Sequence, residues 1–303
     1  MRRFRALVHS ATLEALAEPL SAVLFLSALL TVSLLPVFHC HQFGEPGRLP
    51  RECGFSALLV FGLVFATASA VRVVGGELAS GTASAVLARE VSRTMFFCAK
   101  VTGVLCAFAL FAVAVGAAML ASVATAEMGA AQQALGSRSA VWMPGLAGEV
   151  LGTIAGFALA AACNRFFRMR FCVTACLFVS LAQLPVLAGI AVGASVSFCW
   201  PLLSALAVLA VGCGAFIALA GALAVRLPPS AVTAGIALAV LSSFVWPFRA
   251  VLPDIQLFWL ADSFSGGGIP ASSQLLSALV AGLLLILFWL GVGSVLLERR
   301  EIS

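Results

Sequence analysis

Tyrosine is absent from this 303-residue chain, lysine occurs only as Lys100, and 10% of the residues are charged. Soluble globular domains carry about 25% charged residues. Here 62% of the residues are hydrophobic and the mean hydropathy is +1.14. The composition therefore excludes an ordinary water-soluble domain and is typical of an integral membrane protein.

The scarcity of lysine also limits the chemistry that the chain can perform. A P-loop needs a Gly-Lys-Ser/Thr sequence, but Lys100 lies between Ala99 and Val101. The chain has three histidines, and no Ser/His/Asp set is credible among them. We therefore expect neither an ATPase nor another enzyme. The net charge of +5 is spread between apolar runs, so nucleic acid is not an expected partner.

Long apolar runs account for most of the sequence. A helix needs roughly 20 mostly apolar residues to cross about 30 Å of hydrocarbon, and lipid leaves backbone groups no partners outside a helix. The predicted fold is an all-α polytopic helical membrane protein. Its eight spans are approximately Pro19–Phe38, Gly54–Val74, Phe96–Ala124, Met143–Cys163, Phe171–Val192, Phe198–Val225, Ser230–Val251 and Ser272–Leu297. The break at Trp246–Arg249 leaves six spans plus a re-entrant pair as an alternative.

The basic residues predict the orientation, because they concentrate in cytoplasmic connections. With the N-terminus inside, 13 of the 17 basic residues lie on the cytoplasmic side, and Arg48, Arg51, Arg138 and Arg249 lie outside. Tryptophan favours the interface, and Trp142, Trp200, Trp246 and Trp259 fall at predicted outer ends. We expect one transmembrane domain over residues 1–303, in the cytoplasmic (inner) membrane, with both termini cytoplasmic.

Residues 1–18 are predicted to form an amphipathic helix at the cytoplasmic interface. One face of this helix carries Phe4, Leu7, Val8 and Ala11, and polar side chains such as Thr12 and Glu14 fall largely on other faces. An unstructured basic anchor is the alternative. A cleaved signal peptide fits less well, because the apolar run that follows is too long for one.

The connection at residues 75–94 is a charged turn punctuated by glycine, followed by a short amphipathic segment. From this connection into the next apolar run, the pattern is carried by Glu77, Gly81, Thr82, Val86, Leu87, Val91, Ser92, Arg93, Lys100 and Gly103. In these positions the sequence resembles the ABC-2-type permeases, the membrane subunits of a class of ATP-driven exporters. Glu90 stands where that family commonly has proline, and Ala99 where glycine often precedes the lysine.

The resemblance implies that residues 75–94 form a cytoplasmic coupling loop that contacts a separate ABC ATPase subunit. ATP and magnesium would then bind to that partner, and this chain would need no cofactor. The chain would pair with itself or with a sister permease. The expected coupling residues are Glu77, Gly81, Thr82, Arg89, Arg93 and Lys100, although Arg89, Arg93 and Lys100 would also serve simply to set the topology.

The fourth predicted span carries Gly148, Gly152 and Gly156, a repeat of small residues that allows a second helix to approach closely. Packing within the subunit is the main interpretation, and a dimer seam or a translocation pathway is the alternative. Glu149 lies in the same span. We expect its carboxylate to reach solvent at the outer interface, with a polar vestibule as the alternative.

Two outer segments have further candidate roles. Pro253–Asp262 resembles a segment found in a subgroup of bacterial permeases, and either caps the outer mouth or is a plain solvated connection. Cys40 and Cys53 flank the first outer loop. They are either free, which is the favoured interpretation, or joined in a disulfide. A metal site at His39–His41 fits no zinc spacing, so no metal is expected.

Two other functions compete with the permease interpretation. A secondary transporter driven by an ion gradient predicts ionisable residues near the middle of the membrane, and we find no carboxylate there in the eight runs. A membrane scaffold or assembly factor that transports nothing is disfavoured only by the loop motif.

Overall fold

The fold is described from a computed structural model that covers residues 1–37, 45, 47–83, 91–134, 142–193, 200–243 and 252–300. Over these residues the chain is helical and contains no strand. The longer helices are α1 (Arg2–Ala17), α2 (Pro19–Ser33), α3 (Arg48–Ala70), α6 (Arg93–Ala134), α7 (Trp142–Phe167), α8 (Phe171–Gly193), α9 (Trp200–Ala224), α10 (Pro229–Ser242) and α12 (Ser272–Glu298). The shorter elements are η1 (Leu35–Val37), η3 (Val71–Gly76), α4 (Glu77–Ala79), α11 (Ile255–Phe258) and η5 (Ala261–Gly267).

Five helical segments are long and apolar enough to cross a membrane: Arg48–Ala79, Arg93–Ala130, Ala147–Phe167, Pro201–Ala224 and Ser272–Glu298. A sixth is added if α1 and α2, which meet at a bend of 68°, count as one broken span. Phe171–Pro185 and α10 are shorter apolar stretches. The membrane-protein class is thus supported, while the count of eight spans stays a prediction.

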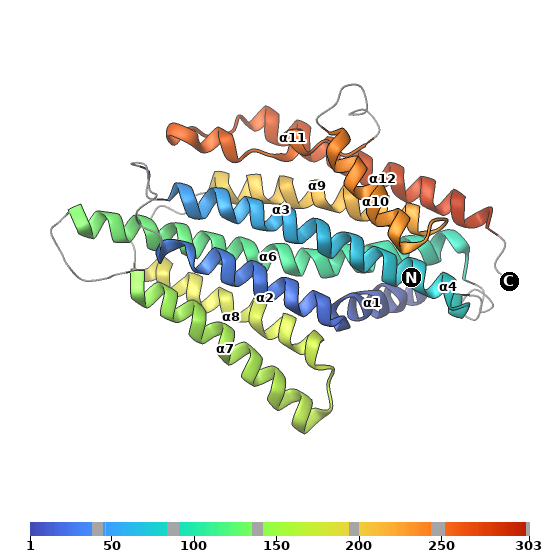
Figure 1. The fold of residues 1–303 in the computed structure, drawn as a ribbon, viewed down its shortest axis with the longest axis horizontal. Coiled ribbons are helices and arrows are strands. Elements are labelled where there is room, and N and C mark those ends of the chain that lie inside the picture. Colours follow the sequence, from blue (N-terminus) through green and yellow to red (C-terminus); the bar gives the residue numbers. More distant parts are fainter. Residues whose placement is uncertain are drawn as a thin grey trace.

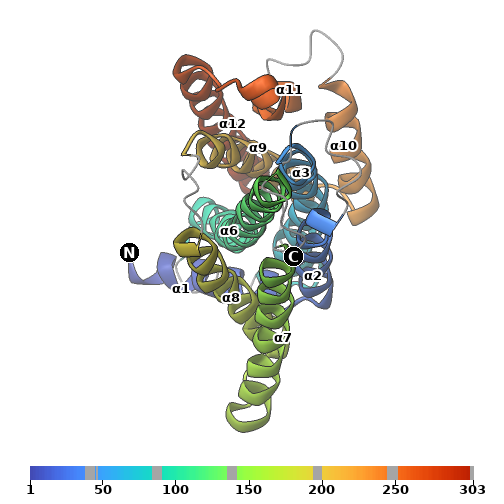
Figure 2. The same cartoon turned by 90° about the vertical axis from the view of Figure 1, so that its left-hand side faces the viewer.

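Helix α6 runs through the centre of the molecule (Figures 1 and 2). Helices α3, α9 and α12 pack on one side of it, and α1 and the α7–α8 hairpin on the other. Its 42 residues extend roughly 63 Å at 1.5 Å per residue, about twice the hydrocarbon thickness. The ends of α6 therefore project beyond the apolar layer.

A cluster of phenylalanines joins α6 to α2 and α3. Phe25 lies edge-on to Phe111, with ring centroids 5.1 Å apart, and Phe65 stacks on Phe111 at 5.7 Å. Phe108 completes the cluster, 6.0 Å from Phe111. Such aromatic pairs contribute about 0.5–1.5 kcal/mol each beyond the area that they bury. This cluster fixes the three helices around which the rest of the molecule is arranged.

One end of the molecule gathers α1, η3, α4 and the last turn of α12 (Figure 1). Arg72, Arg93, Arg226 and Arg299 also lie at this end, whereas Arg48 and Arg51 begin α3 at the opposite end. This separation of charge agrees with the predicted sidedness, since the first group was expected inside and the second outside. We refer to the first end as the basic end.

The segment around α11, which was predicted to lie on the outer side, is inserted between helices. Asp254 caps α11 by accepting a hydrogen bond of 3.0 Å from the Gln256 amide, and Phe258 is buried. A Cβ atom at Gly212 of α9 would lie 2.5 Å from the Phe258 ring. Trp259 packs edge-on against Phe55 of α3. The segment is thus an anchored cap on α3 and α9, and the alternative of a plain solvated connection is wrong.

Glu149 of α7 is only 3% exposed, and its Oε2 atom has no hydrogen-bond partner in the described part of the chain. The expectation that this carboxylate reaches solvent is therefore wrong. Glu149 is buried by tertiary packing, because neighbouring helices cover this face of α7 near Ser33. His39, Cys40 and His41 lie outside the described residues, and no cluster of metal-ligating side chains occurs within them.

Helices α7 and α8 form an antiparallel hairpin joined by residues 168–170 (Figure 1). A Cβ atom at Gly156 would lie 2.9 Å from the backbone N and Cα atoms of Val179, so glycine is needed for this close approach. Gly148 and Gly152 are half-buried on the same helix. Gly156 thus packs within the subunit.

Replacing Gly156 with alanine is expected to lower the free energy of unfolding by about 1–3 kcal/mol, because α8 must move away. The matched control is Gly291→Ala in α12, where an added Cβ meets nothing within 4 Å. That change is expected to be neutral or stabilising by up to about 1 kcal/mol, through higher helix propensity. Denaturant titration in detergent micelles measures both effects, and equal effects would refute the packing argument.

Candidate functional site

The chain's single lysine is buried near the start of α6 and holds two carboxylates. The Lys100 Nζ atom donates to Glu77 Oε1 at 2.6 Å and to Glu14 Oε2 at 3.1 Å. The lysine side chain is 2% exposed, and those of Glu77 and Glu14 are 22% and 29% exposed. Three segments, α1, α4 and α6, therefore meet at this ammonium group. We call Lys100, Glu14 and Glu77 the Lys100 bridge.

Helix α1 reaches the bridge because it packs directly on the backbone of α6. Thr12 Oγ1 donates to the Gly103 carbonyl at 3.1 Å. A Cβ atom at Gly103 would lie 2.4 Å from Ala11 Cβ and 2.8 Å from the Val8 carbonyl oxygen. Thr12 and Glu14, expected on other faces of α1, thus face α6. Glycine at 103 is what allows Glu14 to reach Lys100.

A second ion pair lies at the joint between α1 and α2. Glu18 separates the two helices in an extended conformation, and its carboxylate pairs with Arg72 of η3. η3 is a π-helix that continues α3 into α4. Turns of π-helix are rare in proteins, and those that do occur are often found at functional sites. The bent N-terminal pair and the end of α3 are therefore linked by both the Glu18–Arg72 pair and the Lys100 bridge.

The turn after α4 presents polar atoms at the basic end. Ser80 and Thr82 are exposed, and their hydroxyl oxygens lie 2.9 Å apart. Both hydroxyls also approach the Glu77 carbonyl, at 3.3 and 3.4 Å. Gly81 has a φ of +72°, in the left-handed region that favours glycine. We call Ser80–Thr82 the exposed turn.

Arg93 binds the end of α12 rather than facing away from the chain. Its Nη1 atom donates to the carbonyl oxygens of Glu298 at 2.9 Å and Arg300 at 2.8 Å. Thr94 Oγ1 adds a hydrogen bond of 2.8 Å to the Glu298 carboxylate. The last carbonyls of a helix lack intrahelical partners and carry partial negative charge. Arg93 therefore caps α12.

Replacing Arg93 with glutamine is expected to increase hydrogen–deuterium exchange over residues 295–300 and to destabilise the fold by about 1.5–3 kcal/mol, the range for hydrogen bonds to charged groups. Arg226→Gln is the matched control, because Arg226 donates to one carbonyl at this end, that of Arg299, at 3.1 Å. Arg226→Gln should therefore raise the exchange over residues 295–300 and lower the stability by less than Arg93→Gln does. Equal exchange in the two variants would contradict the assignment of Arg93 as the principal cap.

The predicted site residues are thus divided among three features of the basic end. Glu77 and Lys100 meet in the bridge, Arg93 binds α12, and Gly81 and Thr82 form the exposed turn. Arg89 lies outside the described residues. Glu14, Thr12 and Glu18 were missed as site residues. The available signal was that the one lysine, inside an apolar run, needs a carboxylate from elsewhere in the chain.

No known protein-family model, curated protein or solved structure matches this chain. Its functional assignment therefore depends on the loop resemblance and on the arrangement of the basic end. That arrangement joins an exposed turn to α6 through an ion network centred on a buried lysine.

Proposed function

We propose that this chain is the permease subunit of an ABC-2-type exporter, which moves a substrate across the cytoplasmic membrane with ATP hydrolysed by a separate subunit. The observation that carries the proposal is the connection from the exposed turn through Glu77 to buried Lys100. A partner that pushes on Ser80–Thr82 would act on Glu77, because both hydroxyls contact its carbonyl oxygen.

The mechanism follows from what the Lys100 bridge connects. Closure of the ATPase pair would displace the exposed turn, and the Glu77–Lys100 contact of 2.6 Å would transmit that displacement to α6. Glu14 and the Glu18–Arg72 pair would carry it to α1 and to its bend with α2. Because α6 packs on most of the other long helices, its movement would rearrange the bundle and open a pathway outward.

The exposed turn provides the sharper test of partner binding. Charge reversal at Glu77 or Arg93 would confuse partner contact with folding, because both side chains have partners within the chain. Thr82→Arg changes an exposed side chain. Ser273→Arg is the matched control, because Ser273 is also exposed but begins α12, whose last turn is at the basic end.

The proposal predicts a P-loop ATPase encoded beside this chain, and co-expression with that protein followed by affinity purification measures the association. We expect wild type and Ser273→Arg to retain the ATPase, and Thr82→Arg to retain at least about tenfold less, equivalent to about 1.4 kcal/mol. If the tagged wild-type chain purifies without the ATPase, the permease proposal fails.

A further inference from the structure

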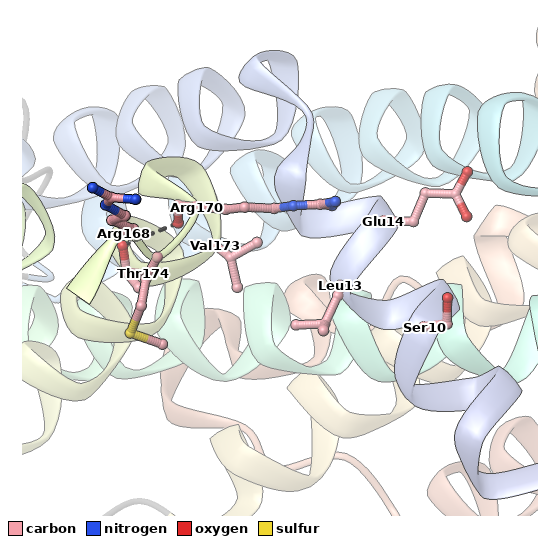
Figure 3. Close-up of a pocket in the computed structure, with 8 residues that line it drawn as sticks. Ser10, Leu13, Glu14, Arg168, Arg170, Val173 and Thr174 are labelled. Carbon is pink, nitrogen blue, oxygen red and sulfur yellow. Dashed lines mark hydrogen bonds between the residues drawn. The ribbon is translucent and has the colours of Figure 1, made fainter. Parts of the chain in front are cut away.

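A hollow at the basic end lies between α1 and the start of α8 (Figure 3). Its volume is about 580 Å³, and its walls are Ser10, Leu13 and Glu14 on α1 and residues 168–170, Val173 and Thr174 on the other side. Arg170 extends from the start of α8 toward α1, and Leu13 and Val173 lie between the two helices (Figure 3). The hollow thus has a cationic entrance and an apolar floor.

The charges of the hollow favour an anion. The guanidinium groups of Arg168 and Arg170 are exposed and form no ion pair with a carboxylate in the described part of the chain. Glu14 is the one carboxylate that lines the hollow, and Lys100, which it shares with Glu77, offsets part of its charge, so the two arginines outweigh it. The first N–H groups of α8 add partial positive charge beside Arg170.

The backbone at Arg168 is also held in a conformation that disfavours most side chains. Its φ is +54°, where glycine is the usual residue after a helix. The turn is fixed by the Arg168 amide, which donates to the Asn164 carbonyl, and by Asn164 Nδ2, which donates to the Met169 carbonyl at 2.7 Å. An arginine occupies a position that glycine would fill with less strain.

Apolar side chains beside the hollow place this turn at the membrane surface. Phe166 is 79% exposed, Phe167 74% and Met169 50%. Arginines and large apolar side chains that alternate along a short segment are typical of the boundary between headgroups and acyl chains. The ligand with both a matching anionic group and an apolar body at that boundary is a phospholipid.

We propose that this hollow binds the phosphate group of an anionic phospholipid, with Arg170 holding the phosphate, Arg168 adding positive charge at the same turn, and Leu13 and Val173 contacting the start of the acyl chains. Placing this lipid in the cytoplasmic leaflet rests on the proposed function, because both use the predicted orientation with the basic end inside. The headgroup site itself needs no ATPase. The bound lipid would bridge α1 to the α7–α8 hairpin, next to Glu14 of the Lys100 bridge.

Native mass spectrometry of the detergent-purified full chain tests the proposal, with phosphatidylglycerol and phosphatidylcholine of identical acyl chains as probes. We expect tighter binding of phosphatidylglycerol, lowered about tenfold in R170Q, as for loss of one charge-assisted contact, and lowered further in R168Q/R170Q. Ser10→Asp, on the opposite wall, should lower it as well without touching either arginine. Arg165→Gln removes one positive charge from α7 outside the hollow, as R170Q does inside it, and should change the affinity less than about twofold.

Three results would overturn the proposal. An equal loss in R165Q, or equal binding of the two lipids, would show that the turn attracts lipid without a specific site. Inorganic phosphate or glycerol phosphate that displaces phosphatidylglycerol at low millimolar concentration would assign the arginines to a soluble phosphate compound instead. None of these results depends on ATPase association, so this proposal and the permease proposal fail independently.

Discussion

Replacing Lys100 with methionine is expected to lower the free energy of unfolding by about 2–4 kcal/mol. Loss of one partner from a buried ion pair costs about 3–5 kcal/mol, because it leaves an uncompensated charge. We expect a somewhat smaller value here, since the Glu14 and Glu77 side chains are 29% and 22% exposed and regain some water. Methionine keeps an unbranched apolar side chain of nearly the same length, so the variant removes the ammonium group and its contact with the Phe96 ring without leaving a large cavity.

The origin of that loss can be isolated with a double-mutant cycle. Glu77→Gln alone should cost less than Lys100→Met, because Lys100 keeps Glu14 as a partner. The double variant should be more stable than the sum of the two single losses, by about 1–3 kcal/mol. Denaturant titration in micelles gives all four values. Strictly additive losses would show that the Glu77–Lys100 contact contributes no coupling.

Replacing Gly103 with leucine is expected to detach α1 from α6 and to cost about 3 kcal/mol, the upper part of the range for overpacking. The obstruction cannot be relieved by a rotamer change alone, because the nearest atoms include Ala11 Cβ and the Val8 backbone. The contact between Thr12 Oγ1 and the Gly103 carbonyl, and the reach of Glu14 to Lys100, should be lost together.

Gly129→Leu is the matched control, because Gly129 lies in the same helix and an added Cβ meets nothing within 4 Å. Hydrogen–deuterium exchange across α1 distinguishes the two variants. Exchange should rise strongly in Gly103→Leu and stay near the wild-type level in Gly129→Leu. Unchanged exchange in α1 for Gly103→Leu would contradict the close packing of α1 on α6.

The helical class was predictable because its cause is compositional. Runs of about 20 apolar residues have few other stable structures in lipid. The apolar runs could not predict where each helix ends, because the ends depend on local breaks in the helix. Helix α2 ends at Ser33 and α10 at Ser242, so both are shorter than the runs that predicted them.

The candidate site was only half predictable. The loop motif contains Glu77 and Lys100, but the amphipathic pattern of α1 assigned Glu14 away from the bundle. The pattern failed because Gly103 permits an unusually close approach, and a second helix at that distance makes polar Thr12 and Glu14 part of the interface. Burial of Glu149 was missed for a similar reason, since it depends on neighbours that are distant in sequence.

The central claim is that the exposed turn contacts an ATPase, and photo-cross-linking in cells tests it most directly. A benzophenone amino acid at Thr82 should cross-link to a protein that carries a P-loop ATPase domain, identified by mass spectrometry, and the same residue at Ser273 should not. An absence of cross-linking at Thr82, or equal cross-linking at both positions, would contradict the claim.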